Sequence, residues 1–245
     1  MYRIVVSVLL LLATTPALAR DGLTNFGKNT LHPLPTADSG NSLGADLSDD
    51  QIASGIKDIL KTGTEKSLAT LARAGGFVSD KKAHILLPPE LEKERAGLTK
   101  LGVADIADNL ELRINQSAEI ILYKGRSTFE DAARRITVEG ARSILNGPPG
   151  AAALYFRGKA TAKLSEALKK IVDGSLDGTG AAASYKAYLA NVKLLPNAPS
   201  VNIDLHDYVL NKTLDGFFYY IAMQEVELRT NPAARTTPWL RTLYN

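Results

Sequence analysis

The chain has 245 residues, of which 45% are hydrophobic and 22% are charged, as in an ordinary globular protein. Its formal net charge is +3 and it has no long basic tract, which argues against a nucleic-acid partner. It contains no cysteine, which excludes disulfides, thiolate catalysis, cysteine-based zinc sites and a lipid anchor on an N-terminal cysteine.

Residues 1–19 have the pattern of a cleavable export signal. Arg3 supplies a positive charge, and Ile4–Leu12 is a mainly apolar run that is too short to span a bilayer. Ala17 and Ala19 place small residues at the two positions that a signal peptidase reads. We therefore expect cleavage after Ala19 and a periplasmic protein without a transmembrane segment in the mature chain. A retained membrane anchor is the alternative.

Residues 20–46 are rich in small and polar residues and have few large apolar ones. Such a segment buries too little surface to offset the entropy lost on ordering, so we expect a flexible leader. It could serve as a tether or as an arm that contacts a partner. A domain covering 47–245 then begins sharply, because Ser48 and Gln51 form a capping box and Leu47 with Ile52 forms a hydrophobic staple.

Apolar residues at steps of three and four predict a chain of helices through this domain. The expected spans are 48–74, 89–102, 103–123, a helix around Phe129 and Ile136, 138–145 with Thr137 as its cap, 152–172, 181–195 and 204–230. Glycine and proline predict loops at 77–88, 147–150 and 174–180, the first of which carries an apolar patch at Ile85–Leu87. The prediction is an all-α single domain of about eight helices without a significant sheet.

The helix expected over 204–230 has the broadest apolar face and should lie at the centre of the domain. Phe217, Phe218 and Ile221 should be its most deeply buried residues. Asp204 or Asp207 can cap its start, and Asn231 suits a left-handed position after its end. Beyond it, Thr237-Pro238 should begin a terminal turn that packs Trp239, Leu240 and Leu243 on the core.

Two runs in this region carry a family resemblance. They are Leu214-Asp215-Gly216-Phe217-Phe218-Tyr219-Tyr220-Ile221-Ala222 and Asn231-Pro232-Ala233-Ala234-Arg235-Thr236-Thr237. With 47–52 and 136–142, they resemble the bacterial domain-of-unknown-function family 4197 over residues 45–245. The resemblance implies a helical, exported protein and supplies no activity and no catalytic residue. Gln224 stands where that family tends to be acidic.

The three histidines, His32, His84 and His206, do not pair with one another at the spacing of helical metal ligands. His206 lies beside Asp204 and Asp207, where a weak metal site is one interpretation. Helix capping by these acids is the other, and it is favoured because it explains both positions. We therefore predict no metal ligands and no cofactor.

The acidic residues of the last long helix do not form a catalytic pair. Glu225 and Glu227 are two residues apart and point to different faces of a helix. Asp215 lies within the aromatic face, where a buried acid needs a cation or hydrogen-bond donors, such as Arg235 or a tyrosine hydroxyl. A structural ion pair is the favoured role, and a catalytic acid is the alternative. The glycine-rich segment 174–180 lacks a phosphate-binding lysine.

Aromatic residues gather in the C-terminal half, at Tyr155, Phe156, Tyr185, Tyr188, Tyr208 and Phe217–Tyr220. They either fill the core or line a pocket for an apolar molecule. The favoured function is a non-catalytic periplasmic module that binds a protein partner, such as an envelope protein, or maintains the envelope. The alternatives are a carrier of a lipid or other apolar ligand, and a hydrolase with an unrecognised site. A continuous apolar cavity of at least about 300 Å³ would favour the carrier.

Overall fold

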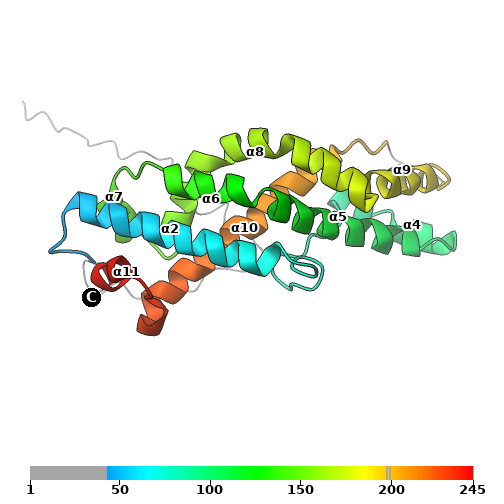
Figure 1. The fold of residues 1–245 in the computed structure, drawn as a ribbon. Coiled ribbons are helices and arrows are strands. Elements are labelled where there is room, and N and C mark those ends of the chain that lie inside the picture. The colour runs from blue at the N-terminus through cyan, green and yellow to red at the C-terminus, as the bar shows by residue number, and fades with distance from the viewer. Residues whose placement is uncertain (1–42, 197, 199, 245) are drawn as a thin grey trace, which may run out of the picture.

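The computed structural model describes residues 43–196, 198 and 200–244 (Figure 1). The predicted signal and all but the last four residues of the predicted leader lie outside this part of the chain. The helices are α2 Asp49–Leu71, α3 Pro89–Glu92, α4 Arg95–Lys100, α5 Asp105–Lys124, α6 Arg126–Arg135, α7 Ala141–Leu145, α8 Ala151–Thr179, α9 Ala181–Val192, α10 Leu205–Thr230, the 3₁₀-helix η1 Pro232–Ala234, and α11 Pro238–Leu243. No strand occurs among the described residues, which confirms the all-α prediction.

Helix α10 is the central element of the domain. It crosses the other long helices obliquely and packs against α2, α5 and α8 (Figure 1). Phe217, Phe218 and Ile221 are fully buried on it, as predicted. Burying each such side chain contributes about 1.5–3 kcal/mol, so this helix anchors the helices that surround it.

Helices α2 and α10 approach each other closely where they cross. This approach depends on Gly63, because a Cβ built there would lie 3.0 Å from Cγ2 of Ile221 and 3.4 Å from its Cα. A side chain at residue 63 would therefore push the two helices apart. The small residue is a packing requirement here and not a helix breaker.

Several predicted helix ends are confirmed by their capping bonds. Ser48 and Gln51 form the reciprocal capping box of α2. The Asp204 side chain accepts from the Asp207 amide at the start of α10, and Thr237 Oγ1 accepts from the Leu240 amide at the start of α11. These bonds satisfy backbone donors that a helix start leaves without partners.

The prediction of a loop at 174–180 is wrong, because α8 continues to Thr179. Gly174 and Gly178 lie on the solvent side, while Ser175 and Leu176 between them are buried. Burial of this face outweighs the cost of about 1 kcal/mol that each glycine imposes on a helix. The helix ends instead at Gly180, whose φ of 77° is left-handed.

Other local predictions are also corrected. Helix α7 starts at Ala141 after Gly140, which has a left-handed φ of 65°, so Thr137 is not its cap. The helix expected over 89–102 is divided into α3 and α4. Asn231 is extended, with φ −121°, and its side chain caps η1 by accepting from the Ala233 amide. In the terminal turn Leu240 and Leu243 are buried, but Trp239 is 42% exposed.

The start of the described chain is attached to α7. Asn146 accepts from the Leu43 amide at 2.8 Å, and Arg142 donates to the carbonyl oxygens of Gly44 and Leu47. Nowhere in the described chain does a helix combine the length and apolar character needed to cross a membrane.

Candidate functional site

A row of polar side chains on α5 holds the segment that precedes α3. Glu111, Asn115 and Glu119 are spaced by four residues and therefore lie on one face of the helix. Asn115 accepts from the Ile85 amide and donates to the Ile85 carbonyl, both at 2.8 Å. Sequence analysis did not recognise this row, although its four-residue spacing was visible.

The two acids of the row bind the ends of the same segment. Glu119 accepts from the amides of Phe77 and Val78 at 2.9 and 3.0 Å, and Glu111 accepts from the Leu87 amide at 3.2 Å. Glu111 also lies 3.0 Å from His84 Nε2. These bonds explain why an irregular segment can lie against a buried helix face, since its backbone groups have partners.

Helix α10 contacts the opposite side of this segment. Tyr208 donates to the Leu86 carbonyl at 2.7 Å, and Tyr220 donates to Asp80 Oδ2 at 2.5 Å. Gly216 permits the approach, because a Cβ there would lie 3.0 Å from the Phe77 ring. The segment is thus held between α5 and α10, and the predicted apolar patch is mostly internal.

Only Leu86 of the Ile85–Leu87 patch faces solvent. Its side chain is 55% exposed, whereas Ile85 and Leu87 are 2% and 3% exposed. The apolar patch noted in the sequence is therefore reduced to one exposed side chain. The alternation places one apolar side chain at the surface, beside a small hollow.

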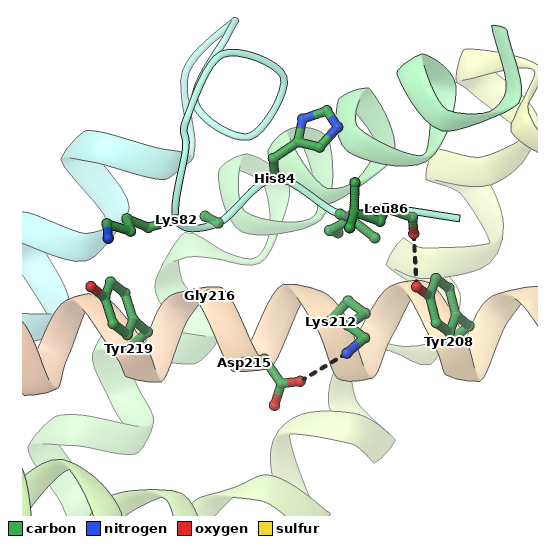
Figure 2. A pocket seen from close by; sticks show the side chains of 10 residues that line it. Lys82, His84, Leu86, Tyr208, Lys212, Asp215, Gly216 and Tyr219 are labelled. Carbon is green, nitrogen blue, oxygen red and sulfur yellow. Dashed lines mark hydrogen bonds and ion pairs between the residues drawn. The ribbon is translucent and has the colours of Figure 1, made fainter. Parts of the chain in front are cut away.

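That hollow, which we call the Lys82 pocket, has a volume of about 110 Å³. It is lined by Lys82, Ala83, His84, Ile85, Leu86, Tyr208, Lys212, Asp215, Gly216 and Tyr219. Figure 2 shows Lys82 and Tyr219 at one end of it, and Lys212 with Tyr208 at the other. The pocket therefore lies along α10, below the segment that α5 holds.

The acid of the pocket is neutralised within the fold. Asp215 forms an ion pair with Arg157 of α8 and lies 3.8 Å from Lys212 Nζ. The structural ion pair predicted for Asp215 thus exists, but its partner is Arg157 and not Arg235, which the sequence had suggested. Arg235 instead donates to the carbonyl oxygens of Leu228, Arg229 and Tyr244.

Two hydrogen-bond donors of the pocket are not used by the fold. Neither the Lys82 ammonium nor the Tyr219 hydroxyl has a hydrogen-bond partner among the described residues. Burial raises the pKa of Tyr219, and it raises the pKa of Tyr208 to about 12, so both hydroxyls keep their protons at neutral pH. The pocket therefore offers a positive charge and hydrogen-bond donors to a ligand that carries a negatively charged acceptor group.

The other acid of interest, Glu225, has a structural role. It is fully buried and accepts from the amides of Ala152 and Ala153, at 3.0 and 3.3 Å, at the start of α8. Arg229 pairs with its other oxygen at 2.8 Å. Burial raises the pKa of Glu225, although Arg229 opposes this effect. Glu227 is exposed and accepts from Asn231, so the two acids do not meet.

The histidines are dispersed. His206 Nε2 lies 3.4 Å from Asp173 and its Nδ1 lies 3.7 Å from Asp204, and all three side chains are about half exposed. Within the described residues, no group of three or more His, Cys, Asp or Glu side chains is arranged to hold a metal ion. His32 lies outside the described residues.

The central aromatic residues pack on one another. The Phe129 and Phe217 ring centroids are 4.4 Å apart, and Phe218 makes edge contacts with Phe217 and Phe156. These rings are fully buried, in agreement with the packed-core interpretation. The larger hollows that we find, of about 510 and 570 Å³, lie at the surface and include exposed charged residues in their linings.

Comparison with known proteins places the chain in a family without supplying an activity. Neither the search of curated proteins nor that of solved structures gives a match. A family model described as a protein of unknown function, DUF4197, matches residues 46–245. This match covers nearly the whole described structure, including the Lys82 pocket, and the chain therefore belongs to the DUF4197 family.

Proposed function

We propose that this chain is an exported, non-catalytic module that binds a partner protein in the periplasm through the Lys82 pocket. The observation that carries the proposal is the pair of unused donors, Lys82 and Tyr219, next to the exposed side chain of Leu86. Export is supported by the pattern of residues 1–19.

The size of the pocket favours one side chain as its occupant. Its volume of about 110 Å³ is below the roughly 150 Å³ of a cavity that holds benzene. Ligand pockets for larger molecules usually measure about 300–1,000 Å³. A carboxylate side chain of a partner matches this size and the two unused donors at one end of the pocket, the Lys82 ammonium and the Tyr219 hydroxyl.

Leu86 supplies the apolar part of the contact. It is 55% exposed, and its backbone is fixed because its carbonyl accepts from Tyr208. Because its backbone is already held in place, less conformational entropy is lost when a partner covers this side chain. The expected partner surface therefore presents an acidic residue next to an apolar one.

The charged residues that could serve a hydrolase are engaged in the fold. Asp215 pairs with Arg157, Glu225 caps α8, and Arg235 binds backbone carbonyls. These three residues do not form one site, which supports binding over hydrolysis. The packed aromatic core likewise favours the binding module over a carrier that shelters its ligand inside.

A photo-crosslinking residue at Leu86, introduced into the full chain in its native cells, tests the proposal. We expect one discrete adduct, which disappears when Lys82→Glu and Lys212→Glu are added because like charges then repel the acidic partner. The matched control is the same crosslinker at Tyr123, which is 67% exposed and lies outside the pocket. Identical adducts at both positions, or an adduct that survives the charge reversals, would refute the binding site.

Export is tested separately by cell fractionation and N-terminal sequencing. The expected product is periplasmic and begins at Arg20. An uncleaved chain in the cytoplasm would contradict the location while leaving the crosslinking result to decide the binding site.

A further inference from the structure

A second hollow lies between α6 and α8, and the proposed partner site does not use it. This α6–α8 groove has a volume of about 510 Å³, within the range of ligand pockets. Residues 128–139 line one side of it and residues 159–167 of α8 line the other. None of its lining residues belongs to the Lys82 pocket.

The floor of the groove is apolar and shallow. Ile136, Ala160 and Leu164 are buried beneath it, and Ala132 and Ala167 flank them. Since alanine side chains are short, they leave room between the two helices where longer side chains would fill it. An apolar ligand in this position would cover a surface that water now reaches.

The segment that follows α6 borders the groove at Ile136, Thr137 and Glu139. The Tyr155 hydroxyl donates to the Thr137 carbonyl at 2.8 Å and accepts from the Glu139 amide at 3.1 Å. Glu139 also pairs with Lys159 at 3.4 Å. The segment is thereby attached to α8, which holds this border of the groove in place.

The residues that line the groove include three cations, Arg135, Lys159 and Lys163, and two acids, Asp131 and Glu139. Asp131 Oδ1 lies 3.0 Å from Nη2 of Arg134, a residue that does not line the groove. Its Oδ2 lies 3.8 Å from Nη2 of Arg135, whose side chain is 82% exposed. Glu139 is neutralised by Lys159. Lys163 forms no ion pair with any of the residues that the structure describes. Arg135 and Lys163 can therefore receive an anionic group.

We propose that the α6–α8 groove binds a single-chain amphiphile with an anionic head group, taken up as a free monomer. The hydrocarbon chain lies on Ala132, Ala160 and Ala167, above the buried Ile136 and Leu164, and the head group contacts Arg135 and Lys163. Apolar burial and charge-assisted contacts each contribute to such binding. The site is a surface groove and needs no interior cavity.

Calorimetric titration of the full chain with dodecyl phosphate, below its micelle concentration, tests the proposal. We expect saturable binding at one site. Dodecyltrimethylammonium has the same chain with the opposite charge, and inorganic phosphate has the head group alone, so both should bind much more weakly. Equal binding of the cationic amphiphile, or binding only to vesicles of anionic lipid and not to monomers, would overturn the proposal.

Variants then locate the site. Lys163→Glu should weaken binding about tenfold or more, since a charge-assisted contact becomes a repulsion. Ala167→Trp should also weaken it by filling the groove from an exposed position, which provides a second test that leaves the core intact. Lys186→Glu, at an exposed position of α9 outside the groove, is the matched control. Unchanged binding in both groove variants would assign the amphiphile to another surface.

Binding of the amphiphile to the groove does not depend on the proposed partner site at the Lys82 pocket. Lys82→Glu should leave dodecyl phosphate binding unchanged, because Lys82 does not line the groove. A loss of binding in that variant would place the amphiphile in the Lys82 pocket and refute the assignment to the groove.

Discussion

Replacing Glu225 with alanine should destabilise the protein strongly. The side chain is fully buried and accepts from the amides of Ala152 and Ala153, so the change removes the only side-chain cap that the described structure provides at the start of α8. It also leaves Arg229, whose side chain is 10% exposed, without its partner. Both effects arise from one substitution and act on two helices.

The expected loss follows from these contacts. Losing a helix cap costs about 0.5–2 kcal/mol, and removing one partner of a buried ion pair costs about 3–5 kcal/mol. The two effects share the same oxygen atoms and are not additive. We therefore expect the free energy of unfolding to fall by about 3–5 kcal/mol, a large share of the roughly 5–15 kcal/mol typical of a domain.

Urea denaturation followed by circular dichroism at 222 nm measures this loss. Glu227→Ala is the matched control, since that acid is exposed and two residues away on the same helix. The control should change the free energy of unfolding by less than about 1 kcal/mol. A loss of less than about 1 kcal/mol in Glu225→Ala would refute the assignment of Glu225 as the cap of α8.

The pH dependence gives an independent check. Burial raises the folded-state pKa of Glu225 above its ordinary value of 4.5, so the folded state binds the proton more tightly than the unfolded state does. This contribution to stability is complete below pH 4.5 and is lost as the pH rises through the raised pKa. Relative to Glu225→Gln, the natural protein should therefore become less stable across that interval. An increase in its relative stability would contradict the stated direction of the pKa shift.

Three further substitutions test the packing around the site. Gly63→Val should cost about 1–3 kcal/mol in urea denaturation, because its side chain would collide with Ile221. Asn115→Ala should cost about 1–3 kcal/mol and speed hydrogen exchange at the Ile85 amide, which loses its acceptor. Arg235→Lys should lower the melting temperature by several degrees, since one ammonium cannot serve the separate carbonyls that the guanidinium reaches.

Substitutions of the same residue types at uncrowded or exposed positions serve as controls, because they change the residue without disturbing the packing or the hydrogen bonds described above. Gly158→Ala should cost nothing, as no atom lies within 4 Å of the added carbon. Asn211→Ala and Arg241→Lys change exposed residues of the same types and should each stay within about 0.5 kcal/mol. If a control lost as much stability as its core counterpart, the packing or hydrogen-bond explanation for that pair would be wrong.

The helical architecture could be predicted because its causes are local. The periodicity of α10 correctly indicated that Phe217, Phe218 and Ile221 are buried, and the capping box at Ser48 correctly marked the start of α2. The end of α8 shows where local reasoning fails. Its glycines at 174 and 178 predicted a loop, but the burial of neighbouring Leu176 keeps the chain helical.

The site itself depended on contacts between distant residues, which a single sequence does not reveal. Asp215 was correctly expected to need a cation, but its partner Arg157 lies on another helix. The function of Glu225 depends on amides 72 and 73 residues away along the chain. The row of Glu111, Asn115 and Glu119 was visible as a spacing, yet only the fold shows what it binds.

The central position of α10 determines when this protein can fold. The long helices that pack against α10, which are α2, α5 and α8, all precede it in the chain, and Glu225 near the end of α10 supplies the cap of α8. A nascent chain that stops before residue 205 lacks both the core element and that cap. We therefore expect folding to wait until synthesis is almost complete, which is compatible with the proposed export because a translocation channel takes an unfolded chain.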